Sequence, residues 1–195
     1  EPMQRRLPRQ ARSRATYAAI LEGAARILRR EGEAALTTNR TAEVAGVGIG
    51  TLYGYFPDKH AIVVALAEQI LEADEQAIAE ALAQPGPDPL RAVIRALIAR
   101  HLTDRALRRI VLRWHIGLGL GASHAQRAHR AIGQVVATAF PPGAPRPDPA
   151  TLFTAAHAVL GVCRALTESD QAPEASEIEA RLVDLLRHAL RPAGL

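Results

Sequence analysis

Apolar residues recur along most of the chain at intervals of three and four residues. This spacing is typical of helices that bury one face, and it predicts helices over residues 15–30, 58–83, 88–102, 104–118, 124–140, 149–168 and 174–190. Glycine and proline mark the connections, most clearly in QPGPDP at 84–89 and PPGAPRPDP at 141–149. We therefore expect an all-α protein.

Residues 37–59 predict two short helices joined by a tight turn. Thr37 can cap the first helix through its hydroxyl, and Gly46 ends it. Leu52 and Phe56 lie four residues apart and turn one stripe of the second helix inward. The outward face keeps small and hydrogen-bonding side chains, including two glycines that cost roughly 1 kcal/mol each relative to alanine. Close approach to a partner's backbone explains such glycines, and the arrangement is a helix-turn-helix.

The end of this stretch predicts an anion site. Pro57 ends the second helix and Asp58 can cap the next one. Lys59, the only lysine of the chain, falls in the first turn of that helix. A helix N-terminus and an ammonium group together favour an anion such as a phosphate.

The stretch resembles the DNA-binding domain of the TetR (tetracycline repressor) family over about residues 15–65. The family pattern is matched by Thr37, Ala42, Ala45, Gly46, Val47, Gly50, Leu52, Tyr53, Tyr55, Phe56 and Lys59. The resemblance implies an N-terminal arm and three-helix helix-turn-helix domain (residues 1–60), followed by a helical bundle that binds a ligand and dimerises (residues 61–195). Thr41 and Gly54 depart from the pattern, since a buried isoleucine and a large contacting side chain are usual there.

Charge and composition agree with a polyanion partner for the N-terminal part. Residues 1–60 hold ten Lys and Arg against six Asp and Glu, whereas residues 61–195 hold fourteen of each, so the net charge of +4 resides in the first third. Five arginines and two prolines within residues 1–14 predict an arm that follows phosphates or enters a minor groove. A disordered solubilising tail is the alternative for this arm.

The predicted contacts to double-stranded operator DNA combine phosphate positioning with limited base reading. The second helix carries no Arg, Asn or Gln, which give the most discriminating contacts to bases. We assign the DNA surface to Thr38, Asn39, Arg40, Gly48, Ile49, Gly50, Thr51, Tyr53, Tyr55 and Lys59. DNA shape, read by the arm, is expected to supply further specificity.

The last two helices predict a homodimer, because a palindromic site needs a two-fold symmetric reader. Helix 149–168 is apolar or small on almost every face, so we expect it to be buried all round. The expected interface comprises Leu152, Ala156, Leu160, Ile178, Leu182, Leu185 and Leu186. Filling of a monomer core is the alternative.

Polar residues among aliphatic ones suggest a pocket for a largely apolar small-molecule effector. Its expected lining is Leu97, His101, Trp114, His115, Phe153 and His157. Ordinary core residues with satisfied hydrogen bonds would produce the same pattern. The resemblance favours a pocket between Leu97 and Cys163.

No catalytic or metal-binding constellation is apparent, so we expect no enzyme activity, no metal and no cofactor. A single cysteine, Cys163, and the lack of an uninterrupted apolar run of about 18 residues predict a cytoplasmic protein without a membrane partner. We expect a homodimeric repressor released by a small molecule. The alternative is a helical sensor or protein-interaction module whose helix-turn-helix no longer reads DNA.

Overall fold

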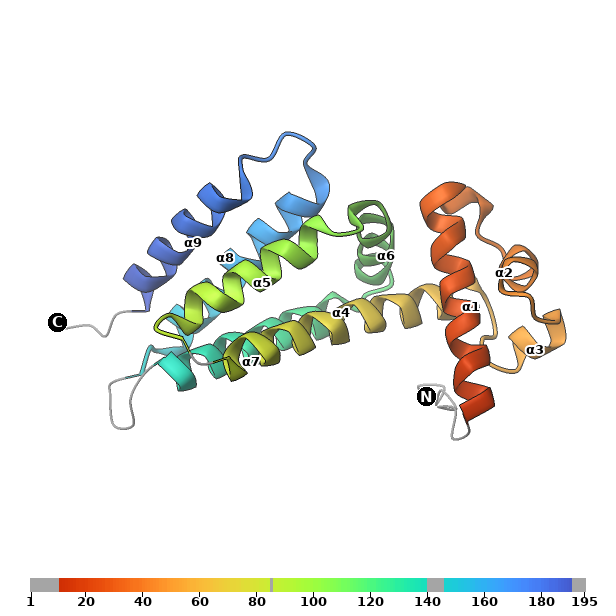
Figure 1. The fold of residues 1–195 in the computed structure, drawn as a ribbon, viewed down its shortest axis with the longest axis horizontal. Coiled ribbons are helices and arrows are strands. Elements are labelled where there is room, and N and C mark those ends of the chain that lie inside the picture. The colour runs from red at the N-terminus through yellow and green to blue at the C-terminus, as the bar shows by residue number, and fades with distance from the viewer. Residues whose placement is uncertain (1–10, 85, 140–145, 191–195) are drawn as a thin grey trace. The chain divides into compact units, whose positions relative to one another are not determined.

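The computed structural model describes residues 11–84, 86–139 and 146–190 (Figure 1). All regular structure in this part of the chain is helical, which confirms the predicted fold class. The elements are α1 (Ala11–Arg30), the 3-10 turn η1 (Glu33–Ala35), α2 (Thr38–Ala45), α3 (Ile49–Tyr53), α4 (Lys59–Ala83), α5 (Pro89–Leu102), α6 (Arg105–Gly117), α7 (Gly121–Ala139), α8 (Pro149–Glu168) and α9 (Ala175–Ala189).

The helices form two compact units, and the chain passes from one unit to the other three times. Unit 1 takes the described residues of Glu1–Gln69 together with Ala106–Gly117, and unit 2 takes those of Ile70–Arg105 and Leu118–Leu195. Helix α4 therefore contributes to both units, and α6 belongs to unit 1 although its neighbours in sequence belong to unit 2. The predicted domain boundary at residue 60 stays a prediction.

The core of unit 1 is built from α1, α2 and α3. Helix α1 buries its apolar stripe, from Ile20 to Leu28, and packs along α2. A Cβ atom on Gly23 would lie 3.1 Å from the Cβ and backbone N of Ala45, so only glycine and a small partner allow the two helices to come this close. The Tyr17 ring, in the first half of α1, stacks on Phe56 with centroids 5.1 Å apart and extends this core.

The turn between α2 and α3 forms as the sequence predicts. The Thr37 side chain accepts a hydrogen bond from the Arg40 backbone N–H at 3.0 Å, and Gly46 ends α2 in the left-handed conformation at φ 69°. Thr41 is fully buried, and its hydroxyl donates to the Thr37 carbonyl at 2.7 Å. The departure from the family pattern at Thr41 is therefore accommodated, because the buried hydroxyl has a partner.

Helix α4 begins and ends where predicted, but the predicted apolar stripe is wrong in its second half. The spacing of apolar residues predicts one face with Ile62, Leu66, Ile70, Ala73 and Ala77, whereas the buried positions of the second half are Leu71, Asp74 and Ile78. The error grows along the helix because steps of four residues overshoot a period of 3.6. The corrected stripe carries a carboxylate, Asp74, on a buried face.

Unit 2 packs α5, α7, α8 and α9 around a continuous apolar core, with the second half of α4 contributing Ile78 and Ala81. One carboxylate, Glu179 of α9, is buried at the edge of this core and only 9% exposed. It accepts hydrogen bonds from Arg95 at 2.9 and 3.0 Å and from Arg91 at 3.1 Å. These bonds, chiefly those from Arg95, hold the pKa of Glu179 below its ordinary value of 4.5.

Helix α8 is not buried all round in the single chain, so that prediction is wrong for one protomer. Phe153 is 54% exposed, and only 33% of the most apolar stretch of α8 is buried. Among the described helices α8 alone is long and apolar enough to span a membrane, a test that core helices also pass. The sequence of α8 shows no uninterrupted apolar run, because a few polar residues lie within it.

The ion pairs of Glu179 generate a stability prediction. Glu179→Gln should lower the free energy of unfolding at neutral pH by about 1 to 3 kcal/mol, because an amide replaces a buried carboxylate that accepts charged hydrogen bonds. Because the pKa of Glu179 is lowered in the folded state, its contribution is present above pH 4.5 and lost as the pH falls through the folded pKa. The difference between variant and parent should therefore shrink in acid, as measured by urea unfolding across pH.

The exposed Glu177 on the same helix provides the control. Glu177→Gln should change the free energy of unfolding by less than about 0.5 kcal/mol at any pH. A Glu179→Gln penalty that stayed constant down to strongly acidic pH would contradict the ion-pair explanation.

Candidate nucleic-acid interface and candidate pocket

Helix α3 presents an exposed face that is poor in side chains. Leu52 is fully buried, while Ile49, Gly50, Thr51 and Tyr53 are exposed. The sequence predicted this division between an inward stripe and an outward surface. A surface with so little bulk lets a helix approach another backbone closely.

The two tyrosines at the end of α3 are fixed by hydrogen bonds to other elements. The Tyr53 hydroxyl lies 3.1 Å from the Thr38 hydroxyl at the start of α2, and the Tyr53 side chain is 53% exposed. The Tyr55 hydroxyl lies 2.9 Å from the Ser13 hydroxyl of α1. Both phenols are thereby oriented at the rim of the α3 face, where each can still accept or donate a further hydrogen bond.

Arg40, predicted to read bases, is engaged within the protein. Its guanidinium bonds Glu31 at 2.9 and 3.2 Å and Glu43 at 2.9 Å. Glu31 and then Glu43 raise the pKa of Arg40 above its usual range, and Arg40 in turn lowers the pKa of Glu31. The charge of Arg40 is therefore already balanced by two carboxylates, and at least three of its five N–H groups face them. Asn39, its neighbour on α2, is exposed.

Lys59 lies in the first turn of α4, as predicted, but the end of this helix already holds an anion. The Asp58 carboxylate accepts a hydrogen bond from the Ala61 backbone N–H at 2.9 Å. The Lys59 ammonium stands 5.5 Å from the centre of the Trp114 ring of α6. A phosphate at this position would therefore be held mainly by Lys59 and less by the helix N-terminus than the sequence suggests.

The space around each glycine of the turn and of α3 differs, so the lack of a side chain has a different explanation at each position. A Cβ atom on Gly54 would lie 3.1 Å from the Thr51 carbonyl oxygen, so its lack of a side chain has a cause inside the protein. Gly48 would meet only the Thr51 hydroxyl at 3.8 Å, and Gly50 would meet nothing within 4 Å. Gly50 is thus the α3 glycine for which contact with a partner is the remaining explanation.

Most of the predicted arginine arm, residues 1–10, lies outside the described residues. The last part of the arm is helical, because α1 begins at Ala11, four residues before the predicted start. Arg12 and Arg14 are exposed in the first turn of this helix. The structure therefore corrects the boundary of the arm at its C-terminal end.

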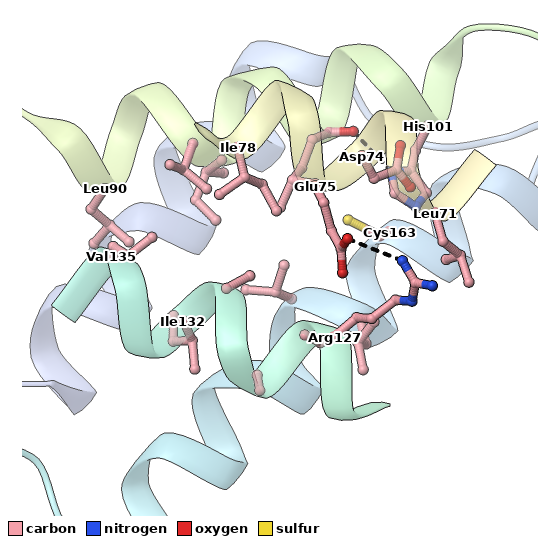
Figure 2. Close-up of a pocket in the computed structure, with 18 residues that line it drawn as sticks. Leu71, Asp74, Glu75, Ile78, Leu90, His101, Arg127, Ile132, Val135 and Cys163 are labelled. Carbon is pink, nitrogen blue, oxygen red and sulfur yellow. Dashed lines mark hydrogen bonds and ion pairs between the residues drawn. The ribbon is translucent and has the colours of Figure 1, made fainter. Parts of the chain in front are cut away.

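Unit 2 contains a pocket between α4, α5, α7 and α8 with an empty volume of about 690 Å³, counting space open to solvent (Figure 2). Its wall is mostly aliphatic, with Cys163 on one side. Charged groups gather at one end, where Arg127 reaches from α7 to Glu75 of α4 at 3.0 Å, as Figure 2 shows. Asp74 also lines this end and accepts a hydrogen bond from Arg100 at 3.0 Å.

The pocket collects only part of the residues that the sequence suggested. Leu97 and His101 line it, and the His101 ring nitrogen Nδ1 lies 2.9 Å from the Leu97 carbonyl oxygen. Trp114 and His115 belong to unit 1 instead, on α6. Their apolar neighbours in sequence misled the assignment, because a helix between two pocket helices along the chain need not line the pocket.

Phe153 and His157 also lie outside the pocket, on the exposed face of α8. Their rings stack with centroids 4.0 Å apart, and the His129 ring of α7 lies 5.3 Å from Phe153. The pocket residues that sequence reasoning missed are Asp74, Glu75 and Arg127. A signal for Asp74 was present, since it falls three residues after Leu71 and four before Ile78 on the buried stripe.

The residues predicted for a dimer interface divide between two faces. Ala156, Leu182 and Leu186 fill the core of unit 2 and are already buried in one chain. Leu152, Leu160 and Ile178 are half-buried, and Leu185 is 54% exposed. The predicted set therefore combines core residues with surface residues. The outward apolar positions of α8 and α9 lie next in sequence to the positions that face the core, so the sequence pattern did not separate the two groups.

Comparison with known proteins addresses the family. Residues 20–66 match the model of "Bacterial regulatory proteins, tetR family". A search of curated proteins finds no match to the chain. In the described part of the chain, no group of three or more His, Cys, Asp or Glu side chains could hold a metal ion.

Three solved structures illustrate the likeness in fold. The multidrug binding protein EbrR, complexed with imidazole, is 20% identical with a TM-score of 0.67, over 97% of this chain and 96% of that chain. A bacterial regulatory protein in the tetR family from Rhodococcus RHA1 is 23% identical with a TM-score of 0.60, over 91% and 98%. A TetR-family regulator from Mesorhizobium loti is 18% identical with a TM-score of 0.67, over 92% and 97%.

The short exposed α3, held by α1 and α2 and followed by a long helix into a helical bundle, defines a helix-turn-helix transcriptional regulator that binds DNA. Residues 20–66 carry the DNA-binding domain of the TetR family of bacterial regulatory proteins, and the solved structures share the fold of the chain. The resemblance seen in the sequence is thereby confirmed, while the individual contact residues stay predictions.

Gly50 offers a test of the proposed close approach. Gly50→Ala should raise the free energy of unfolding by about 0.5 to 1 kcal/mol, because alanine is the better helix former and its Cβ has free space. It should at the same time weaken DNA binding, because the added methyl meets the DNA. Urea unfolding and titration of labelled DNA measure the two effects.

Gly133 in the middle of α7 supplies the matched control, since an added Cβ also meets nothing within 4 Å. Gly133→Ala should stabilise the protein without changing DNA affinity. Unchanged affinity for Gly50→Ala would mean that α3 does not approach DNA through Gly50.

Proposed function

We propose that the protein is a homodimeric repressor that binds a palindromic operator through α3 and its flanks and is released by a small molecule. The observation that carries the DNA part is the exposed face of α3, from which side-chain bulk is missing at Gly50 without an internal reason. The only lysine of the chain and two oriented tyrosines border this face.

Positioning on the phosphates is expected to dominate recognition in this proposal. Lys59 and Tyr53 bind phosphates, while Thr38, Asn39 and Thr51 lie where base edges or sugars can be reached. Ile49, exposed at the start of α3, suits a thymine methyl group. The net share of Arg40 in the affinity is small, because Glu31 and Glu43 already balance its charge.

The uncovered face of α8 supports the homodimer. Phe153 of α8 and Leu185 of α9 are large apolar side chains left more than half exposed in one chain. Residues Val162, Ile178 and Leu185 line a shallow groove between these helices that a second copy could fill. A two-fold axis through this face would give two α3 helices, one for each half of a palindrome.

The pocket of unit 2 supports an organic effector with a long apolar part. Aliphatic side chains line most of it, and only one end carries Asp74, Glu75, His101 and Arg127. EbrR, a protein of similar fold, is described as multidrug binding. The buried Cys163 in this wall suits the reducing cytoplasm that we propose as the location.

Lys59→Ala tests the phosphate contact. The variant should bind all DNA sequences more weakly by a similar factor, and its affinity should fall less steeply with salt, by about one unit of slope. Fluorescence anisotropy of labelled random-sequence and selected duplexes over a salt series measures both quantities.

Arg146 is exposed in the loop before α8. Its substitution by alanine is the matched control, because it removes one positive charge from unit 2. Arg146→Ala should leave the slope unchanged. A loss confined to one selected duplex would contradict the role of Lys59, and affinity insensitive to salt would favour the alternative protein-interaction module.

The effector is tested by reciprocity. If a compound in the pocket lowers the affinity for DNA, the same coupling requires DNA to lower the affinity for the compound by an equal factor, typically about 5- to 150-fold. Calorimetric titration of a hit from a library of apolar compounds, with and without bound DNA, measures this factor. Ala131→Trp, which fills the pocket from α7, should abolish compound binding while DNA binding persists. Equal compound affinity in the two conditions would separate the pocket from DNA release.

A further inference from the structure

Trp114, the only tryptophan of the chain, lies at the centre of a polar cluster in unit 1. Its indole N–H donates to the Glu33 carboxylate, which also accepts a hydrogen bond from Arg113 at 2.7 Å. The Lys59 ammonium stands 5.5 Å from the centre of the indole ring, and the His60 ring centroid lies 5.4 Å away. One side chain of α6 thus contacts segments on both sides of the helix-turn-helix.

These two segments are the flanks of the motif in sequence. Glu33 belongs to η1, four residues before the cap Thr37, and Lys59 follows Phe56, the last buried residue of the motif, by three. Trp114 therefore bridges the entry and the exit of the helix-turn-helix.

The indole acts on Lys59 through the face of the ring. A cation over an indole is attracted by the negative face of the π system, while its N–H groups that point away from the ring can still donate to an anion. A free lysine side chain loses much rotamer freedom when it binds a phosphate. Lys59 held on the ring has lost part of that freedom before DNA arrives.

We propose that Trp114 is a positioning residue for DNA binding, which holds the Lys59 ammonium at the phosphate contact and fixes this contact relative to η1 through Glu33. The inference rests on the proposed phosphate role of Lys59. The charged or titratable groups around the pair are Glu33, Arg113, His60 and Asp58, whose carboxylate lies 3.7 Å from the His60 ring.

A purely structural role for Trp114 would require it to belong to the core of unit 1. Its side chain is only half-buried, and α6 is anchored by Leu107, Val111 and the fully buried His115 instead. Replacement of the indole should therefore leave unit 1 folded. Substitutions at Trp114 can then test the contact between the ring face and Lys59 without unfolding unit 1.

A double-mutant cycle tests the proposal on a random-sequence duplex of roughly 30 base pairs, which accommodates two half-sites. Trp114→Leu should weaken binding by about two- to fivefold, because Lys59 must then lose more of its rotamer freedom on binding, while the salt slope stays unchanged because the charge remains. Trp114→Phe keeps a ring and should stay within about twofold of the parent. In a Lys59→Met background, Trp114→Leu should have no further effect.

The single lysine permits a second readout that needs no DNA. Acetylation of Lys59, followed by mass spectrometry of its peptide, should be faster in Trp114→Leu than in the parent and near parental in Trp114→Phe, because the ring shields the amine. Equal losses of DNA affinity for Trp114→Leu with and without Lys59, or unchanged acetylation, would overturn the positioning role while leaving the proposed function intact. If Lys59→Met bound DNA as well as the parent, the phosphate role of Lys59 and the positioning role would both fail.

Discussion

The structure depends on one continuous helix that belongs to both units. Helix α4 runs from Lys59 to Ala83 with backbone hydrogen bonds along its whole length, and its first eleven residues serve unit 1 while the rest serve unit 2. Its first turn carries Lys59, and its second half supplies Leu71, Asp74 and Ile78 to the pocket wall. The backbone of α4 is therefore continuous between the pocket wall of unit 2 and the first turn in unit 1.

The second connection between the pocket and the DNA-binding unit passes through α6. Its neighbours along the chain, α5 and α7, both line the pocket, whereas α6 itself belongs to unit 1. Trp114 on α6 and Lys59 on α4 meet in unit 1. The pair thus joins α6 to the first turn of α4, whose second half lines the pocket. A ligand can use this arrangement only to the extent that it binds one state of the pocket more tightly than another.

The sequence specifies helices and the turn far better than the sites, and particular residues show why. Thr37, Gly46 and Asp58 act within a few residues of themselves, so local spacing predicted their capping roles correctly. The pocket depends on contacts between distant segments, and the position of Trp114 and His115 among aliphatic residues could not reveal that α6 packs in unit 1. The charges of Glu75 and Arg127 were missed because each looks like an ordinary surface charge until α4 and α7 are placed side by side.

The same limit applies to the DNA surface, where the structure changes the weight of individual residues. Arg40 was assigned to the DNA surface with nine other residues, yet Glu31 and Glu43 already neutralise its charge within the protein. Gly54 seemed to mark a lost contact, whereas the Thr51 carbonyl leaves no comfortable space for a Cβ atom there. What remains is a helix with little hydrogen-bonding capacity, bordered by Tyr53 and Lys59, for which we propose contacts to phosphates. Such a surface favours recognition of DNA shape and backbone position over direct reading of bases, so selectivity should depend strongly on the spacing between the two half-sites of a dimer.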